Sequence, residues 1–459
     1  MMSTELAETR SPSAAMRNLE DIYELSPLQL DNFNRYLTSQ GDGLFHENLI
    51  FNFVGEIDDR IFTQCWNEIL KRHSILRTAF INKGIGKPIQ AVLRKALFPI
   101  QIHDWTGISE EEQAHRMEVV IEADRLIPYC MEEAPLMRVT LIHLNDRKFR
   151  LWWRFHHMIM DGWAFTVVLF DFLQLYKQLS SSGEVALMLP GYPYKDYIRY
   201  LKNRDTAEES AFWPEYLQGC THQPPLSLLK PPAPEAPVSQ IRQGRLDYHI
   251  YELFQPLQEV IKASKVTMNG VFQGIFSLLI SHLSSGGADV VTGQTVADRP
   301  MLLENAQARV GLFVNTLPIR CQIRKEEGFV EWVRGIQTSM MNTFRFASSS
   351  EQEIKHWCGM SDDRDLFHSA LVFKNIPLAD DPFVGLPFRT DDYNLESRPH
   401  FPLSLFVWPE AKLELKLIYD NSLYSSESAW SVLNNVRAAL VKFIEHPDIS
   451  VSSMMDFDI

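Results

Sequence analysis

The sequence is poor in cysteine and in basic residues, and each shortage argues against a class of protein. Five cysteines occur among 459 residues, and no two of them have C-x-x-C spacing. We therefore expect neither a disulfide framework nor a zinc ribbon, and a reducing, cytoplasmic setting fits best. Lys and Arg number 44 against 58 Asp and Glu, which gives a net charge of −14. A nucleic-acid partner is not expected, because it requires a basic face.

Long apolar runs are also missing. No stretch of 18 consecutive apolar residues occurs, so no membrane span is expected. The first residues, "MMSTELAETRSPSAAMRN", lack the apolar core of a signal peptide, and we predict a mobile tail over residues 1–17. The chain is longer than the roughly 250–300 residues that one core usually supports, so two lobes are expected.

The stretch "RFHHMIMDGWAF" (154–165) combines two adjacent histidines with an Asp-Gly pair. Adjacent histidines on a strand point to opposite faces, so they rarely share a metal ion, and no metal site is expected. The G-x-S-x-G elbow of a serine hydrolase is absent. A structural histidine at a strand end is the common alternative. The remaining interpretation is a neutral imidazole that acts as a general base at cytosolic pH.

Helix and strand patterns alternate along the chain, which indicates an α/β or α+β class. In the first part, an amphipathic helix over 58–73 has Asp58 as its N-cap, and Ser109 and Glu112 form a capping box for a second helix. A hairpin flanks "NDRK", and an apolar helix follows the Asp-Gly pair. The later part has expected helices at 271–283, 329–344 and 426–446, and expected strands at 288–296, 368–375, 401–408 and 412–420.

The segment 221–239 contains six prolines and has the composition of a linker. Composition alone would therefore place a domain boundary there.

Several segments together resemble a known family. "HHMIMDG" resembles the HHxxxDG signature of nonribosomal peptide synthetase condensation domains. The segments "DIYELSPLQL", "RHSILRTAF", "YKDYIRYL" with "FWPEYL", and "VGLFVNTLPIR" resemble other motifs of that family, in the same order. The resemblance extends over about residues 18–456.

The resemblance implies a fold of two chloramphenicol-acetyltransferase-like lobes, arranged as a V-shaped pseudo-dimer with a central tunnel. The expected N-terminal lobe spans 18–185 and the expected C-terminal lobe 186–459. A floor loop is expected at about 292–318 and a latch at about 377–400. The proline-rich stretch then becomes a loop inside the second lobe.

The resemblance also assigns roles within the motif. His157 corresponds to the catalytic histidine, and His156 to a preceding, structural one. Asp161 corresponds to a structural aspartate that pairs with an arginine, and Arg77 is our candidate for that arginine.

Gly162 is grouped with the structural residues of the motif, and two further residues are candidates for the tunnel. Gly162 is expected to leave a gap for the pantetheine arm. Asn315 and Trp163 are expected to line the tunnel, although Asn315 can equally serve to satisfy backbone groups. Asp298 departs from the family pattern, because glycine is common at that position.

The function that the resemblance implies is acyl transfer. An acyl group passes from a carrier-protein phosphopantetheine thioester to an amine, forming an amide in nonribosomal peptide or hybrid polyketide–peptide biosynthesis. No bound cofactor is expected, because carrier proteins supply the phosphopantetheine arm in trans. The expected partners are a donor carrier and either an acceptor carrier or a small soluble nucleophile, with no nucleic acid, no membrane and a monomeric state.

Three alternatives remain open. The enzyme can form esters or release chains onto a small soluble alcohol or amine. It can be an acyl-CoA-dependent acyltransferase resembling wax ester synthases, which share HHxxxDG. It can also be a docking module without catalysis.

Overall fold

A computed structural model describes residues 17–39, 43–125, 127–183, 189–220, 243–284, 287–361, 365–374, 382–409 and 413–457. The predicted tail, except for residue 17, and the proline-rich stretch 221–239 lie outside the described residues. The chain divides into two compact units, which are described separately.

The division differs from the boundary expected at 185/186. Unit 1 comprises Met1–Asn203, Arg299–Leu312 and Leu378–Ser397, and unit 2 comprises the rest. The chain first passes from unit 1 to unit 2 after Asn203, because helix α6 (Lys195–Asn203) packs against strand β1 (Leu19–Glu24) of unit 1. The expected floor loop is divided, since Arg299–Leu312 packs with unit 1 while its flanks form strands of unit 2.

Unit 1 is built on a five-stranded sheet with the strand order β12-β2-β7-β6-β5 and a small sheet with the order β1-β4-β3. The strands are β1 (Leu19–Glu24), β2 (His46–Gly55), β3 (Thr78–Ile81), β4 (Ile89–Leu93), β5 (Ile100–Asp104), β6 (Met137–Asn145), β7 (Lys148–His156) and β12 (Phe388–Glu396). The helices are α2 (Pro27–Thr38), α3 (Asp59–Arg72), α4 (Glu110–Arg125), α5 (Ala164–Ser182) and α6, with short 3-10 turns η1 (Ser74–Arg77) and η2 (Ala306–Ala308). All neighbours in the larger sheet are antiparallel except β5 and β6.

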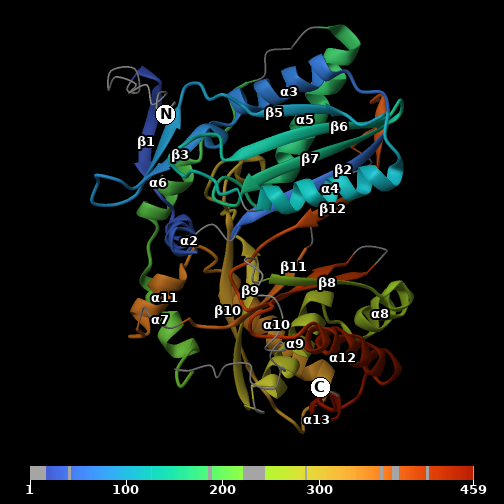
Figure 1. Cartoon of the computed structure of the whole chain (residues 1–459). Helices are drawn as coiled ribbons and strands as arrows, with labels where there is room; N and C mark the ends of the chain where they lie inside the picture. Colours follow the sequence, from blue (N-terminus) through green and yellow to red (C-terminus); the bar gives the residue numbers. More distant parts are fainter. Residues whose placement is uncertain are drawn as a thin grey trace, which may run out of the picture. The chain divides into compact units, whose positions relative to one another are not determined.

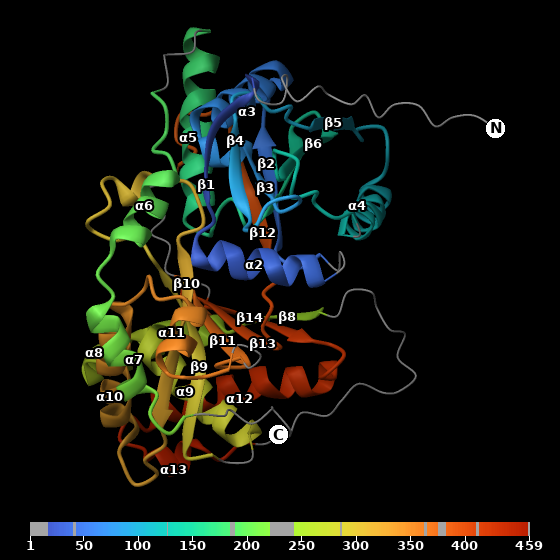
Figure 2. The ribbon, with the colours of Figure 1, turned by 90° about the vertical axis from the view of Figure 1, so that its left-hand side faces the viewer.

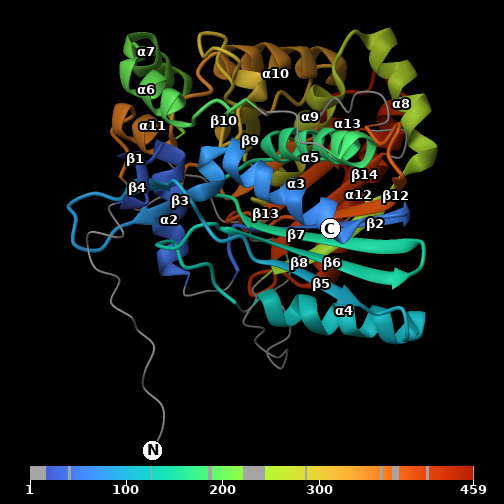
Figure 3. The ribbon, with the colours of Figure 1, turned by 90° about the horizontal axis from the view of Figure 1, so that it is seen from above.

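Helices cover both faces of the larger sheet (Figures 1 and 3). Helices α3 and α5 lie side by side over one face, where Trp66 of α3 packs edge-on against Trp153 of β7. Helix α4 lies along the opposite face, where Met117 joins a buried cluster with Ile142 and Trp152. The alternation of side chains along β7 therefore directs Trp152 and Trp153 into two different layers.

Helix α3 illustrates how closely local sequence sets structure. The Asp58 side chain accepts hydrogen bonds from the backbone N–H groups of Arg60 and Ile61, as expected for an N-cap. The buried face of the helix is formed by Phe62, Cys65, Trp66, Ile69 and Leu70. Burial of each large apolar side chain contributes about 1.5–3 kcal/mol, so this face, rather than intrinsic helix propensity, holds the helix in place.

Unit 2 contains a six-stranded sheet with the order β10-β9-β11-β13-β14-β8 (Figure 2). Its strands are β8 (Gln243–His249), β9 (Asp289–Ala297), β10 (Val314–Gln322), β11 (Ser369–Phe373), β13 (Leu403–Trp408) and β14 (Glu414–Asp420). Its helices are α7 (Ala207–Tyr216), α8 (Tyr251–Ser264), α9 (Met268–Leu283), α10 (Phe329–Phe344), α11 (Glu351–Trp357), α12 (Ser426–Glu445) and α13 (Val451–Met454). Helices α9, α10 and α12 contribute to one large apolar core together with inward-facing residues of this sheet.

Within the described ranges, no single helix is long and apolar enough to cross a membrane. The consecutive helices α8 and α9 pass that test only as a pair, and they meet at a bend of 99°.

Candidate active site

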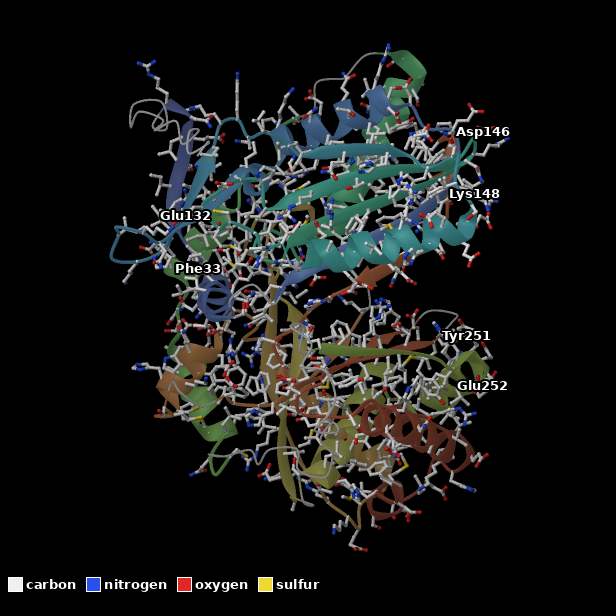
Figure 4. All side chains as sticks on the ribbon, viewed as in Figure 1. Phe33, Glu132, Asp146, Lys148, Tyr251 and Glu252 are labelled. Atoms are coloured by element: carbon white, nitrogen blue, oxygen red, sulfur yellow. The ribbon has the colours of Figure 1, made fainter. Side chains whose placement is uncertain are left out.

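The HHxxxDG motif begins at the last residue of β7 and ends just before α5. Figure 4 shows Asp146 and Lys148, at the turn between β6 and β7, at one end of unit 1, and Phe33 and Glu132 toward the other end. The motif thus lies at the end of β7 remote from that turn, where a strand gives way to a turn and then to a helix. The strand expected before the motif therefore ends at His156, the first histidine of the pair.

His156 is completely buried and packs against aromatic rings. The ring of Tyr36 meets it edge-on at 4.6 Å, and the rings of Tyr129 and His46 lie at 5.9 and 5.8 Å. Burial holds the pKa of His156 well below its usual value, and the nearby His46 and His157 lower it further. His156 is therefore neutral near pH 7. Its Nδ1 accepts the backbone N–H of Met158 at 3.2 Å, which places the ring proton on Nε2.

His157 is half-buried, and its backbone N–H donates to the carbonyl of Phe45 at 2.8 Å. Phe45 reaches this position with φ 61, a left-handed conformation that non-glycine residues rarely adopt. The Nδ1 of His157 is buried and has no hydrogen-bond partner in the described part of the chain. No carboxylate of the described residues orients this imidazole, in contrast to the arrangement of a Ser-His-Asp triad.

Asp161 has a structural role, and its partner is Arg299. Its Oδ1 accepts the N–H groups of Trp163 at 3.0 Å and Ala164 at 2.7 Å, at the start of α5. The same oxygen lies 3.4 Å from a guanidinium nitrogen of Arg299, and both side chains are at least 96% buried. Burial lowers the pKa of Arg299, while the charge of Asp161 raises it. The expected pairing of Asp161 with Arg77 is wrong.

Arg77 is held at a different place in unit 1. Its Nε donates to the carbonyl of Leu70 at 2.9 Å, and Nη1 pairs with Glu20 at 2.7 Å and contacts the carbonyl of Leu93. The Leu70 carbonyl belongs to the last turn of α3, where helix carbonyls lack intrahelical partners. Arg77 therefore joins the end of α3 to β1 and β4, and it does not contact Asp161. Arg299 lies 138 residues from Asp161, a separation that no local pattern reveals.

Trp163 and Gly162 form the turn after Asp161, and both are half-buried. The indole N–H of Trp163 donates to the carbonyl of Gln307 at 2.9 Å, and the Arg299 guanidinium lies 5.6 Å from its ring centroid. The polar atom of Trp163 thus holds the segment 299–312 instead of being available to a substrate. Gly162 does not have a positive φ, so backbone conformation does not require glycine there. Its role as a gap for a pantetheine arm stays a prediction.

Asn315, in β10 of unit 2, has both ends of its amide engaged by backbone. Its Nδ2 donates to the carbonyls of Ala347 and Ser349, each at 2.7 Å, and its Oδ1 accepts the N–H of Thr316 at 2.8 Å. These contacts agree with the alternative that Asn315 satisfies backbone groups instead of binding substrate. Both hydrogen atoms of its amide are already donated to backbone carbonyls. Asp298 is also anchored, since it accepts the Ser348 hydroxyl at 2.8 Å.

Within the described residues, no group of three or more His, Cys, Asp or Glu side chains is arranged to hold a metal ion. The motif offers one imidazole, that of His157, on a turn held by backbone hydrogen bonds. That turn is followed by a helix whose start is capped by a buried, paired aspartate.

Comparison with known proteins agrees with this geometry. The Condensation domain family model matches residues 19–456, nearly the whole chain. The chain belongs to the condensation-domain family. Members of this family are acyltransferases that form amide bonds in nonribosomal peptide synthesis.

Several relatives and solved structures are similar to this chain. One of the linear gramicidin synthase subunits of Brevibacillus parabrevis is 30% identical over 447 residues, which are 95% of this chain and 8% of the gramicidin synthase chain. The starter condensation domain of rhizomide synthetase RzmA, in a mutant form in complex with C8-CoA and Leu-SNAC, has a TM-score of 0.82 at 16% identity. That match covers 98% of this chain and 100% of the RzmA domain. Holo-AB3403, a four-domain nonribosomal peptide synthetase bound to AMP and glycine, has a TM-score of 0.76 at 17% identity. Here 95% of this chain matches 34% of the synthetase.

These matches confirm the expected condensation-domain fold. The chain spans only 6–8% of the length of the linear gramicidin synthase subunits that it matches.

Proposed function

We propose that this condensation domain transfers an acyl group from a carrier-bound thioester to an amine, with His157 as the residue that acts on the amine. The proposal rests mainly on a difference between the residues of the intact HHxxxDG motif. His156 and Asp161 are buried in structural contacts, whereas His157 is only half-buried and its Nδ1 has no hydrogen-bond partner among the described residues. The histidine that is left is the one with a proton-accepting nitrogen to offer to a substrate.

The proposed reaction is a single acyl transfer. The acceptor nitrogen forms a bond to the thioester carbonyl carbon, and the carbon–sulfur bond breaks to release the pantetheine thiol. The amine loses one proton as the new bond forms, and the departing thiolate gains one. His157 accepts the proton or orients the neutral amine by a hydrogen bond. In the second case, positioning supplies most of the rate.

The partners belong to the proposal. Two carrier proteins deliver the donor and the acceptor on phosphopantetheine arms in trans, and the domain holds no cofactor of its own. A small soluble amine or alcohol is the alternative acceptor. The proposed compartment is a reducing cytoplasm, which is supported by the five free cysteines.

Reconstitution with purified carriers tests the proposal. A donor carrier loaded with an acyl chain is mixed with an aminoacyl acceptor carrier, and intact-protein mass spectrometry follows the mass of both. The expected result is a gain of the acyl mass on the acceptor carrier and a free thiol on the donor carrier. Growth of a free amide or ester instead identifies a small soluble nucleophile as the acceptor.

Two further arms separate the alternatives. Acyl-CoA replaces the donor carrier in the first, and product formed as fast from acyl-CoA as from the carrier contradicts carrier-dependent transfer. The second arm screens a panel of carriers and acceptors for product. Specific carrier binding without transfer to any acceptor identifies a docking module.

A further inference from the structure

The turn that carries His157 is fixed by backbone hydrogen bonds on each side of the catalytic residue. The His156 N–H donates to the carbonyl of Leu136 at 2.9 Å, and the His157 N–H donates to the carbonyl of Phe45 at 2.8 Å. The Met158 N–H donates to the His156 ring. These three N–H groups are therefore satisfied within the protein, and the turn has little freedom to change shape.

The carbonyl of Met158 is held by a side chain from helix α2. The Nε2 of Gln29 donates to this carbonyl at 3.0 Å, and Gln29 is completely buried. The orientation of its amide is determined by its neighbours, because Oε1 accepts the backbone N–H of Ser26, which can only donate. The Oε1 also accepts a hydrogen bond from Gln90 at 2.8 Å. Gln29 therefore presents a fixed donor to the residue that follows His157.

Tyr36 lies two turns further along the same face of α2. Its ring packs edge-on against His156, the residue that precedes His157. Its hydroxyl accepts the N–H of Tyr129 at 2.8 Å and donates to the Tyr129 carbonyl at 3.1 Å. One helix thus contacts the residue on each side of the catalytic histidine.

Helix α2 is itself well anchored. Ser26 and Gln29 form a complete capping box, and Pro27 occupies the first helical turn. Asn32 and Phe33, between the two contact residues, are also buried, and Figure 4 labels Phe33 on this helix. The helix therefore provides a rigid base for both contacts.

We propose that Gln29 and Tyr36 are positioning residues for His157. This inference rests on the proposed function of His157, and neither residue is assigned a contact with substrate. Gln29 fixes the carbonyl after His157, and Tyr36 fixes the ring before it. A shift of about 1 Å in a reacting group can cost about 100-fold in rate, so loss of either contact lowers kcat while carrier binding is preserved.

Gln29→Met, compared with Ser26→Ala, tests the inference. Both substitutions weaken the cap of α2, but only Gln29→Met removes the hydrogen bond to Met158. We expect Gln29→Met to lower kcat about tenfold or more, with the KM for each acyl carrier within about twofold of the parent. We expect Ser26→Ala to lower the melting temperature to a similar extent and to leave kcat within about twofold. Equal kcat values for the two variants would overturn the inference.

Tyr36→Leu, compared with Tyr36→Phe, provides a second test should Gln29→Met not fold. Tyr36→Leu removes the ring that contacts His156, whereas Tyr36→Phe retains this ring and removes only the hydroxyl that contacts Tyr129. A kcat of Tyr36→Leu that is about threefold or more below that of Tyr36→Phe supports the inference, and equal kcat values contradict it.

The NMR signal of the His157 ring Cε1–Hε1 group separates this inference from the proposed function. If the parent forms no product with any carrier, the proposed function fails, but the signal still reports the position of the ring. A shift of this signal in Gln29→Met and not in Ser26→Ala supports positioning. An identical signal in both variants and the parent overturns it.

Discussion

At the level of single residues, the motif aspartate has the expected structural role, but its arginine partner is Arg299 and not the expected Arg77. Asp161 caps α5 and pairs with Arg299, and both side chains are buried. A buried ion pair is costly to break from one side, because the remaining charge is left without compensation in a low-dielectric interior. The pair therefore ties the segment 299–312 to the turn that carries His157.

A double-mutant cycle between Asp161→Asn and Arg299→Met measures this pairing. Arg299→Met alone is expected to lower the free energy of unfolding by about 3–5 kcal/mol, because Asp161 stays buried and charged. The double variant should lose less than the sum of the two single changes. The matched cycle with Arg77→Met should show no coupling to Asp161, since Arg77 pairs with Glu20. Urea denaturation measures the free energy of unfolding of each variant. A coupling between Asp161 and Arg77 would contradict the pairing of Asp161 with Arg299.

Asn315 provides a second prediction at this scale. Its amide serves the carbonyls of Ala347 and Ser349, so Asn315→Ala leaves buried backbone groups without partners. The expected loss is about 1–3 kcal/mol in the free energy of unfolding, with kcat and KM of the folded fraction unchanged. A variant of parental stability whose KM rises severalfold would return Asn315 to the substrate-binding residues.

At the level of helices and strands, the sequence predicts segments that have a regular apolar pattern, whereas it does not predict segments that lack one. The helix expected at 329–344 is α10 with the same bounds, and the expected hairpin around "NDRK" is β6 and β7. Strand β12 was not predicted, because its sequence, FRTDDYNLE, is largely polar and its burial follows no strict alternation. It exists because its backbone pairs with β2, more than 330 residues away. Such pairing leaves no signature in local sequence.

Gly55 gives a direct test of the pairing between β2 and β12. It has φ +142, and a Cβ atom there would lie 2.2 Å from the carbonyl oxygen of Pro387. Gly55→Ala should therefore displace β12, with loss of amide-exchange protection over 388–396 and retained protection in β6 and β7. Gly84→Ala is the matched control, because Gly84 also has positive φ but no atom within 4 Å of the added Cβ. Protected β12 amides in Gly55→Ala would contradict the close approach.

At the level of the whole molecule, the order of the motifs predicts the overall fold, but it does not predict the boundary between the two units. Alternating helix and strand patterns predicted a mixed class, and the family resemblance predicted the condensation-domain fold that the solved structures share. The expected boundary near 185 was placed too early, since Tyr194 and α6 remain part of unit 1. The Tyr194 hydroxyl donates to the carbonyl of Leu312, a contact across 118 residues that sequence spacing does not indicate.

Buried neutral histidines predict how the stability of the molecule depends on pH. Burial lowers the pKa of His156, and it also lowers the pKa of His73 despite the hydrogen bond of that ring to Asp171. In the unfolded chain both take up protons below about pH 6.5, whereas the folded state resists protonation. Stability therefore falls as pH decreases. Between pH 7.5 and 5.5, His156 alone should account for a loss on the order of 1 kcal/mol.

Urea unfolding at pH 7.5, 6.5 and 5.5 measures this dependence. The carboxyl groups with lowered pKa values, Asp104 and Glu112 among them, titrate below this range and contribute at more acidic pH. A stability that is flat or that rises toward pH 5.5 would contradict the assignment of His156 as a buried neutral ring.

A single-turnover measurement tests whether His157 carries out the acyl transfer. Donor and acceptor carriers, each fully loaded, are mixed with an excess of the parent domain or of His157→Ala, and the acyl mass on the acceptor is followed with time. We expect the transfer rate to fall about 10²–10⁴-fold for His157→Ala, the range typical for loss of a positioned acid–base group. A His157→Ala protein that transfers the acyl group within about threefold of the parental rate would contradict it.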